Sequence, residues 1–496
     1  MNDQHARLKR PFVLASIMLA TFLSAIEGTI VATAMPSIVA DLEQFSLYSW
    51  VFSAYLLTSS VTVLLFGKLA DLFGRKPIFI FGIVVLLIGS TLAGSSTTMP
   101  FLIFSRLIQG IGAGALVPVA TTIVGDIYTK EERGKVQGYL SSVWGISAIA
   151  GPLAGSFFVE FSDWRYVFWM NIPLGLIAIF GIILFFKEDV VREKTKINYM
   201  SFVYLIGFLS SFMYILVEAG STYAWTSGVI LSFIAMTLIF LTLFIYNQKG
   251  TSDPIIPVQL WDDKLIFIAN LTSLLTGAIM ISISSYLPTF VQGVLGKTAL
   301  IAGFTLTTMS IGWPLASTIS GRVLFKVGYR KISLIGAWSL LIGTSLFIIL
   351  SIYPSVYIAA FASLFVGVGM GTTSTAFIVS IQTEVAWRVR GIATATNMFM
   401  RSIGSAIGVA FLGGLLNSHL QKELAGITIE GKQMTADIMD QLLTDETLEG
   451  LSTDMISLLQ SVLQAGLGKV YLSVFIIAMI SFIFIYFLPK ERTRKQ

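Results

Sequence analysis

Cysteine is absent from this chain of 496 residues, and histidine occurs only twice, at His5 and His419. A disulfide framework, a thiolate metal site and a catalytic thiol are therefore excluded, and no histidine metal centre or other metal site is expected. Charge is also scarce, because Asp, Glu, Lys and Arg make up 12% of the residues, about half of what an average soluble domain carries. With 55% apolar residues, the composition predicts an all-α integral membrane protein rather than a soluble enzyme.

The chain is rich in long apolar runs. A membrane-spanning helix needs about 20 predominantly apolar residues, and we identify fourteen candidate spans on that rule. They lie near 12–34, 47–67, 78–98, 101–125, 136–159, 165–186, 199–218, 226–246, 265–290, 299–325, 332–352, 355–381, 392–416 and 467–488. We interpret the first as a retained helix rather than a signal peptide, because its apolar run is too long and contains Glu27.

The basic residues predict the orientation. With both termini in the cytoplasm, 25 of the 32 Lys and Arg residues fall in inside segments and five fall outside. Short loops rich in Lys and Arg stay cytoplasmic. The net charge of +5 therefore reflects basic residues that mark the cytoplasmic loops. It favours anionic membrane lipids over nucleic acid as partners.

One loop sequence occurs twice. Gly67 to Lys76 recurs in weaker form at Gly321 to Lys331, an offset of 254 residues. Since six helices need only about 177 residues here, an insertion must separate the two copies. We predict a 6+2+6 arrangement with a six-helix bundle at 11–187, an inserted helical pair with linkers at 188–264, and a second bundle at 265–490. Transporters are commonly built from such repeats.

The second bundle includes an extracellular loop at 417–466, the one long polar stretch of the sequence. Its eight acids and helically spaced apolar residues predict short amphipathic helices or a cap over the outer mouth. A solvated loop without function is the alternative.

Ionisable residues inside spans are rare. An ionisable side chain there costs about 2.5–3.5 kcal/mol, so each is a candidate functional residue. The candidates are Glu27, Arg106, Glu218 and Arg401. Glu27 could hold a proton in an apolar interior and release it on contact with water or a cation, which is what a proton-coupled carrier needs. Alternatively, it is a structural carboxylate permanently paired with Arg106 or Arg401.

The fifth span contains Gly145, Gly151, Pro152 and Gly155. Small residues let neighbouring helices approach closely, and proline bends a helix. Close packing alone would explain the glycines, whereas the Gly-Pro pair suits a helix that bends as a carrier changes state.

Two segments resemble nucleotide-binding motifs but lack a feature that such motifs require. Gly296-Lys297-Thr298 lacks the required earlier glycine, where Val291 stands, and the glycines from Gly110 to Gly114 follow no strand. We therefore expect no nucleotide and no other cofactor.

These motifs resemble the major facilitator superfamily, and specifically its fourteen-helix drug:proton antiporter branch, over nearly the whole chain. The resemblance implies a gating role for the loop after the second helix, at Gly67, Asp71, Gly74, Arg75 and Lys76, with Asp126 as the acidic partner.

Further spans carry the same resemblance. The family's fourth-helix motif, which is linked to proton handling, resembles Arg106, Gln109, Gly110 and Gly112. The glycines of the fifth span are similar to a motif of antiporters. This branch also has segments that resemble Trp164 to Phe168, Asn171 to Pro173 and Arg390 to Gly404. Glu27 departs from the pattern, which usually has aspartate at this position.

We therefore expect a multi-pass protein of the bacterial inner membrane, a monomer, that exports amphiphilic, cationic or zwitterionic compounds in exchange for protons. Proton coupling is assigned to Glu27, Arg106 and Glu218. The predicted substrate contacts are Glu27, Gln109, Trp144, Trp313, Asn397, Met398 and Arg401. Exporters of one endogenous solute, such as a lipid, siderophore or peptide, are the alternative, and a membrane enzyme or sensor is disfavoured because no catalytic constellation is present.

Overall fold

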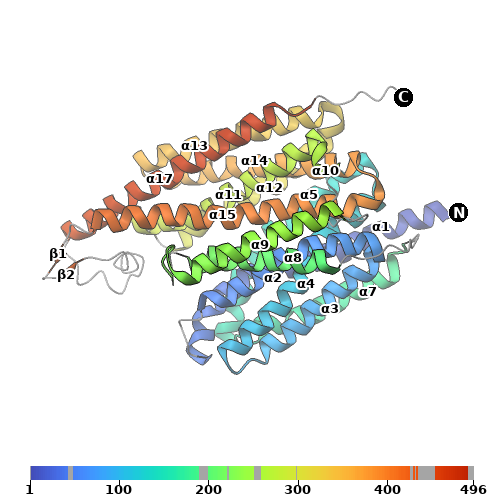
Figure 1. Cartoon of the computed structure of the whole chain (residues 1–496), viewed down its shortest axis with the longest axis horizontal. Helices are drawn as coiled ribbons and strands as arrows, with labels where there is room; N and C mark the ends of the chain where they lie inside the picture. Colours follow the sequence, from blue (N-terminus) through green and yellow to red (C-terminus); the bar gives the residue numbers. More distant parts are fainter. Residues whose placement is uncertain are drawn as a thin grey trace. The chain divides into compact units, whose positions relative to one another are not determined.

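The computed structural model describes residues 2–42, 48–188, 199–219, 223–250, 259–297, 299–424, 428–429, 432–433 and 453–489. Long helices dominate it (Figure 1). The chain forms two compact units, each described by itself. Unit 1 comprises Met1–Phe267, Gly321–Phe325 and Thr375–Phe399, and unit 2 comprises Ile268–Ser320, Lys326–Ser374 and Met400–Gln496.

Unit 1 is built on the helices of the first half of the chain. They are α1 (Asn2–Leu42), α2 (Tyr48–Phe73), α3 (Arg75–Gly94), α4 (Met99–Ile127), α5 (Lys130–Phe161), α6 (Tyr166–Trp169), α7 (Asn171–Phe185), α8 (Tyr199–Glu218), α9 (Gly228–Gly250) and α10 (Gln259–Asp262).

The second half supplies the remaining elements. They are α11 (Lys264–Thr289), the π-helix η2 (Phe290–Val294), α12 (Ala299–Val327), α13 (Tyr329–Ile352), α14 (Val356–Glu384), the 3₁₀-helix η3 (Trp387–Val389), α15 (Arg390–Leu424), the antiparallel strands β1 (Thr428–Ile429) and β2 (Lys432–Gln433), and α17 (Thr453–Tyr486). The end of α14, η3 and the start of α15 belong to unit 1.

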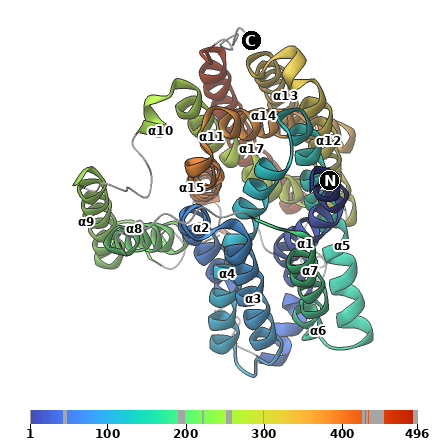
Figure 2. The ribbon, with the colours of Figure 1, turned by 90° about the vertical axis from the view of Figure 1, so that its right-hand side faces the viewer.

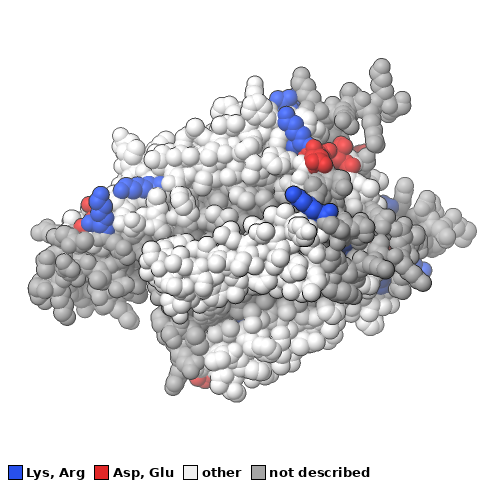
Figure 3. All heavy atoms as spheres, in the orientation of Figure 1, with Lys and Arg blue, Asp and Glu red and all other residues white. Residues whose placement is uncertain are grey.

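Within the described residues, twelve helices are long and apolar enough to cross a membrane. Two of the fourteen expected spans do not meet that criterion. In α8 the apolar stretch Met200–Leu216 is too short, and α12 is a helix of 29 residues that is not among the twelve. Among the described residues on the face that Figure 3 shows, charged side chains are few and the surface over the helices is almost wholly white.

The ends of several spans differ from the sequence prediction. The helix α1 is 41 residues long, and the expected span at 165–186 is interrupted at Met170, between α6 and α7. Pro173 is tolerated in the first turn of α7, where its missing N–H would have no helical partner. In the expected loop at 417–466, residues 425–427, 430–431 and 434–452 lie outside the described residues. Its two flanks are helical, in α15 and α17.

Both copies of the repeated loop turn in the same way. Gly74 precedes α3 with φ 97°, and Gly328 precedes α13 with φ 93°. Glycine adopts positive φ without the steric penalty of a side chain. The two glycines are 254 residues apart, so the repeat found in the sequence is also a repeat of backbone conformation.

The glycine run that resembled a nucleotide motif lies inside α4 and is a packing surface. A Cβ atom on Gly110 would overlap Thr58 Oγ1, and one on Gly114 would overlap Thr62 Oγ1. Thr58 Oγ1 donates to the Leu107 carbonyl at 2.9 Å, which joins α2 to α4. Close approach of small residues is how helices associate in a membrane, and it places Arg106 and Gln109 in the interior of unit 1.

Candidate functional site

Glu27 lies on α1 and is completely buried. Its carboxylate forms an ion pair with the guanidinium of Arg106, on α4, which is also completely buried. Of the two basic partners considered from sequence, Arg106 is therefore the one in contact, whereas Arg401 belongs to unit 2.

Three amide and hydroxyl side chains complete this cluster. Gln109 donates from Nε2 to Glu27 Oε1 at 2.9 Å and to Ser90 Oγ at 2.7 Å, while its own Oε1 accepts from Arg106 Nη1 at 2.9 Å. Asn171, the first residue of α7, donates from Nδ2 to Glu27 Oε1 and to Ser90 Oγ, the latter at 3.1 Å. We call Glu27, Ser90, Arg106, Gln109 and Asn171 the carboxylate cluster.

Arg106 is held by contacts that do not depend on Glu27. Its Nε donates to the Val51 carbonyl at 3.2 Å, and its guanidinium carbon lies 4.3 Å from the centre of the Tyr55 ring. Tyr55 in turn donates to the Ser24 carbonyl at 3.0 Å. Removing one charge of a buried ion pair leaves the other charge uncompensated. If Glu27 became neutral, the Val51 carbonyl and the Tyr55 ring would still hold the Arg106 guanidinium in place.

The glycines of the fifth span pack against the same helix that carries Glu27. A Cβ on Gly151 would overlap Thr29 Oγ1, and one on Gly155 would lie 3.0 Å from the Ile30 carbonyl. Thr29 Oγ1 donates to the Ser147 carbonyl at 3.1 Å, which fixes α5 to α1. Close packing thus accounts for Gly151 and Gly155, and it occurs within one turn of Glu27.

A second polar cluster lies at the opposite end of α4. Arg75 donates from Nη2 to Asp71 Oδ1 at 2.8 Å, and its Nε lies 3.0 Å from Asp126 Oδ2. Arg390, at the start of α15, donates to Asp126 Oδ1 at 2.6 Å. The cluster of Asp71, Arg75, Asp126 and Arg390, which we call the loop cluster, therefore joins α2, α3, α4 and α15 within unit 1.

Asp71 also caps a helix. Its two carboxylate oxygens accept from the backbone N–H groups of Gly391 and Ile392 at 3.1 and 2.9 Å. Negative charge at a helix N-terminus is stabilised by the unpaired N–H groups there. A Cβ on Gly391 would lie 2.5 Å from Asp71 Oδ1, so any larger residue would require the Asp71 carboxylate to shift.

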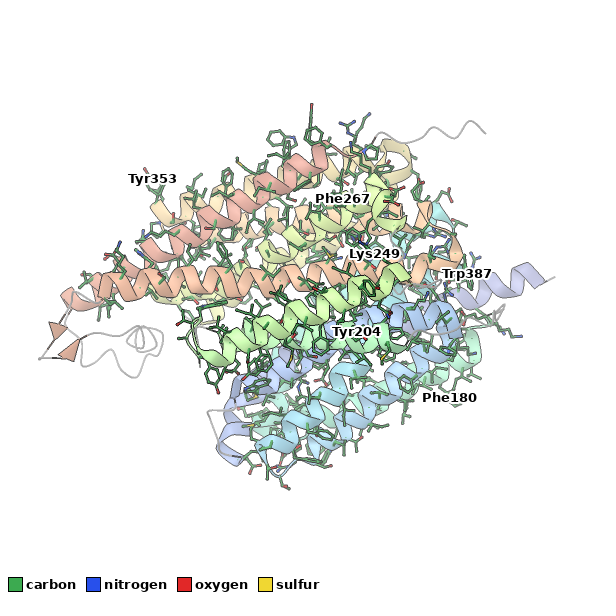
Figure 4. The ribbon with its side chains drawn as sticks, in the orientation of Figure 1. Phe180, Tyr204, Lys249, Phe267, Tyr353 and Trp387 are labelled. Carbon is green, nitrogen blue, oxygen red and sulfur yellow. The ribbon has the colours of Figure 1, made fainter. Side chains whose placement is uncertain are left out.

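Trp387 of η3, which Figure 4 labels, contacts Arg75 of the loop cluster. The guanidinium carbon of Arg75 lies 4.0 Å from the centre of the Trp387 ring, and Arg75 Nη2 donates to the Trp387 carbonyl at 3.1 Å. Stacking on an aromatic face is a contact that guanidinium makes readily.

The other residues of the loop motif have structural roles. Lys76 Nζ donates to the carbonyls of Ile183 and Phe186 at 2.9 and 2.5 Å, and Glu188 accepts from the Arg75 and Lys76 N–H groups at the start of α3. A Cβ on Gly67 would overlap Ala395 Cβ.

Several contributors to these clusters were not assigned from sequence. Arg390 entered only as the start of a segment that resembles the family, and Ser90 and Glu188 had no local signal. Asn171 entered only through the family resemblance. Their roles depend on contacts between residues more than 80 positions apart in the chain.

The expected substrate contacts are dispersed. Gln109 belongs to the carboxylate cluster, Trp144 is 49% exposed, and Asn397 is buried in unit 1. Trp313 packs against the core of unit 2 and Arg401 lies in that unit, whereas the half-buried Met398 lies in unit 1. Glu218 ends α8 and is buried, with 6% exposure.

Metal ligation finds no support in the described part of the chain, where no group of three or more His, Asp or Glu side chains is placed to hold a metal ion.

Comparison with known proteins identifies the family of this chain. The family model of the Major Facilitator Superfamily matches residues 17–409. Multidrug resistance protein 3 of Bacillus subtilis is 36% identical over 406 residues, covering 81% of this chain and 78% of the relative. Multidrug transporter protein MdtP of the same organism is 32% identical, with coverage of 84% and 77%. The efflux pump dotC of Dothistroma septosporum is 31% identical, with coverage of 83% and 72%.

Solved structures share the fold at low sequence identity. The human organic anion transporter MFSD10 (TETRAN) aligns with a TM-score of 0.63 and 14% identity, over 95% of this chain and 99% of that one. The proton:xylose symporter XylE aligns with a TM-score of 0.64 and 12% identity, over 99% and 97%. By the family match and by sequence identity across most of its length, this chain belongs to the Major Facilitator Superfamily.

Proposed function

We propose that this protein is a proton-coupled antiporter that exports amphiphilic, cationic or zwitterionic drugs and toxic compounds by alternating access. The observation that carries the proposal is the burial of Glu27 against Arg106, Gln109 and Asn171. Burying a carboxyl group in an apolar span costs free energy. Its ability to bind and release a proton is the function that would explain its presence there.

Proton binding would change this cluster in a defined way. An ionised Glu27 attracts Arg106 and accepts from the two amides. A protonated Glu27 loses the ion pair, while Arg106 keeps the Val51 carbonyl, Gln109 Oε1 and the Tyr55 ring. One proton would thus weaken the tie between α1 and α4, and a cationic substrate could replace that proton as the neutralising charge.

The loop cluster is the proposed cytoplasmic gate. It consists of four charged side chains from α2, α3, α4 and α15, with Trp387 stacked on Arg75. Opening a path on this side requires all of these contacts to separate together, which gives the gate two distinct states rather than a continuum.

The substrate class rests on the relatives. Three of them are named as a multidrug resistance protein, a multidrug transporter and an efflux pump. Glu27, Gln109, Trp144, Trp313, Asn397, Met398 and Arg401 stay our proposed substrate contacts, and Glu218 a proposed proton-coupling residue.

We further place the chain in the fourteen-helix branch, as a monomer in a bacterial plasma membrane with both termini in the cytoplasm and anionic lipids around its basic loops. The helices α8 and α12 would supply the two spans beyond the twelve. The proposed domains are 11–187, 188–264 and 265–490, with 417–466 as the extracellular loop. The equal turns at Gly74 and Gly328 support the duplication behind this 6+2+6 arrangement.

Transport into inverted membrane vesicles under an imposed pH gradient tests the proposal. A panel of dyes and drugs should accumulate with the wild-type protein and not with Glu27→Gln, which keeps the shape of the side chain but cannot exchange a proton. Glu160→Gln, at an exposed position of α5, is the matched control and should behave as wild type. Unchanged proton-driven accumulation by Glu27→Gln would refute the assignment.

A further inference from the structure

Arg401 places a charged side chain in the interior of α15. It lies 11 positions after Arg390, which corresponds to about 16 Å of helix axis, or about half the thickness of the hydrocarbon core of a membrane. The residue is half-buried, and its guanidinium keeps its proton as arginine does in proteins. This part of unit 2 therefore carries a permanent positive charge far from either end of the span.

No described residue supplies a counter-charge to Arg401. Within the part of the chain that the structure describes, its guanidinium has no ion pair or side-chain hydrogen bond, and no charged side chain acts on it. Three arginines of unit 1 differ in this respect. Arg75, Arg106 and Arg390 each contact a carboxylate.

The sequence of unit 2 explains why this charge lacks a partner. Its segments Ile268–Ser320 and Lys326–Ser374 contain no Asp or Glu. In its third segment the acids begin at Glu423, 22 positions after Arg401 and therefore about 33 Å further along the same helix. An arginine side chain cannot span that distance.

Close packing between α11 and α15 holds the backbone at Arg401. The two helices lie side by side (Figure 2), and a Cβ on Gly277 of α11 would overlap the Arg401 carbonyl oxygen. Ser405 Oγ donates to the Gly277 carbonyl at 3.1 Å, one turn further along α15. Long basic side chains near the ends of a span extend to the membrane surface. Packing and depth together keep Arg401 from that solution.

An anion is the partner that this position lacks. An unpaired charge in a low-dielectric environment costs free energy, and an anion in contact with the guanidinium would offset that cost. The parallel N–H groups of a guanidinium match the two oxygens of a carboxylate, which they bind in a bidentate fashion. A cationic group would instead be repelled.

We propose that Arg401 binds the carboxylate of an amphiphilic substrate. The inference deepens the proposed function, on which it rests, because it singles out zwitterions that bear a carboxylate as a substrate class and makes Arg401 the residue that recognises this group. A purely cationic compound gains no such contact. A lipid phosphate carries the same charge as a carboxylate, and the experiment below separates these two sources.

Two dyes that differ in one group test the inference. Rhodamine 110 is a zwitterion with a free carboxylate, and rhodamine 123 is its methyl ester and a cation. Fluorescence anisotropy measures the binding of each dye to the full-length protein in phosphatidylcholine nanodiscs. The variants are Arg401→Gln, Arg401→Lys and the matched control Arg330→Gln, which removes a positive charge at the start of α13 in the same unit.

We expect the wild-type protein to bind rhodamine 110 more tightly than rhodamine 123. Arg401→Gln should weaken the binding of rhodamine 110 by about 10- to 100-fold, because hydrogen bonds between charged groups are lost. The same variant should not weaken rhodamine 123, and this retained binding shows that the protein is folded. Arg401→Lys keeps the charge and should keep part of the preference, and Arg330→Gln should leave both dyes unchanged.

Equal weakening of both dyes by Arg401→Gln would overturn the proposal, as would a wild-type protein or an Arg401→Lys protein without the preference. So would an effect of Arg401→Gln on rhodamine 110 that disappears in phosphatidylglycerol nanodiscs, because the guanidinium would then hold a lipid phosphate. The measurement is made at equilibrium and without a pH gradient. Binding without proton-driven export would therefore contradict the proposed function alone, and export without Arg401-dependent binding would contradict this inference alone.

Discussion

The side-chain amide of Asn171, at the first position of α7, donates a hydrogen bond to Oε1 of Glu27 on α1, the same oxygen that accepts from Gln109. This contact connects the interruption between α6 and α7 to the buried carboxylate. Asn171, directly after the one-residue interruption at Met170, thus places a polar side chain against the one acid of the carboxylate cluster.

Replacing Asn171 by leucine should reduce proton-driven transport. A hydrogen bond to a charged group contributes about 1.5–3 kcal/mol, so we expect a loss of about 10- to 100-fold in initial rate. The measurement is drug accumulation in inverted vesicles at matched expression. Gln292→Leu, which removes a half-buried amide from η2, should stay within about twofold of wild type. Equal effects of the two substitutions would contradict a specific role for Asn171.

Arg75→Lys should impair the loop cluster although the charge is kept. Arginine here contacts Asp71, Asp126 and the ring of Trp387 at once, and a lysine ammonium cannot reproduce that planar geometry. We expect transport to fall by at least about tenfold and the apparent melting temperature in detergent to decrease.

Lys76→Arg is the converse control for that experiment, because the Lys76 ammonium group donates to two backbone carbonyls. A guanidinium can serve those acceptors too, so we expect its transport to be close to wild type. Wild-type transport by Arg75→Lys would show that charge alone suffices at residue 75.

Gly391→Ala should disrupt the cap that Asp71 forms on α15. The added Cβ would lie 2.5 Å from Asp71 Oδ1, and overpacking of this kind costs about 1–3 kcal/mol. Gly414→Ala tests the same change on the same helix at a position with nothing within 4 Å. We expect about tenfold slower transport for Gly391→Ala and little change for Gly414→Ala. Tolerance of alanine at both positions would argue against the cap.

Gly151→Ala should destabilise the contact between α5 and α1. Its Cβ would overlap Thr29 Oγ1, whereas Gly228 at the start of α9 has free space around it. We expect a lower apparent melting temperature and slower transport for Gly151→Ala, and neither effect for Gly228→Ala. A stable Gly151→Ala protein with slow transport would instead favour a role in bending rather than in packing.

Much of this architecture was predictable from the sequence because its signals are local. Long apolar runs indicate spanning helices, and the recurrence of Gly67 to Lys76 at Gly321 to Lys331 indicates duplication. The scarcity of charge singled out Glu27 and Arg106, since an ionisable group in an apolar run has few possible roles. Of the fourteen expected spans, twelve meet the criterion of length and composition within the described residues, whereas the apolar stretch of α8 is too short and α12 is a helix outside the twelve.

What composition and periodicity determined by themselves is the class of protein, the positions of the apolar helices and the identity of the buried acid. Only the tertiary structure decided that Glu27 contacts Arg106 and Asn171, and that Arg390 and Gly391 complete the loop cluster. The physical reason is that hydropathy and helical period act over a few turns of chain. The partner of a buried charge is set instead by helix packing between residues tens to hundreds of positions apart.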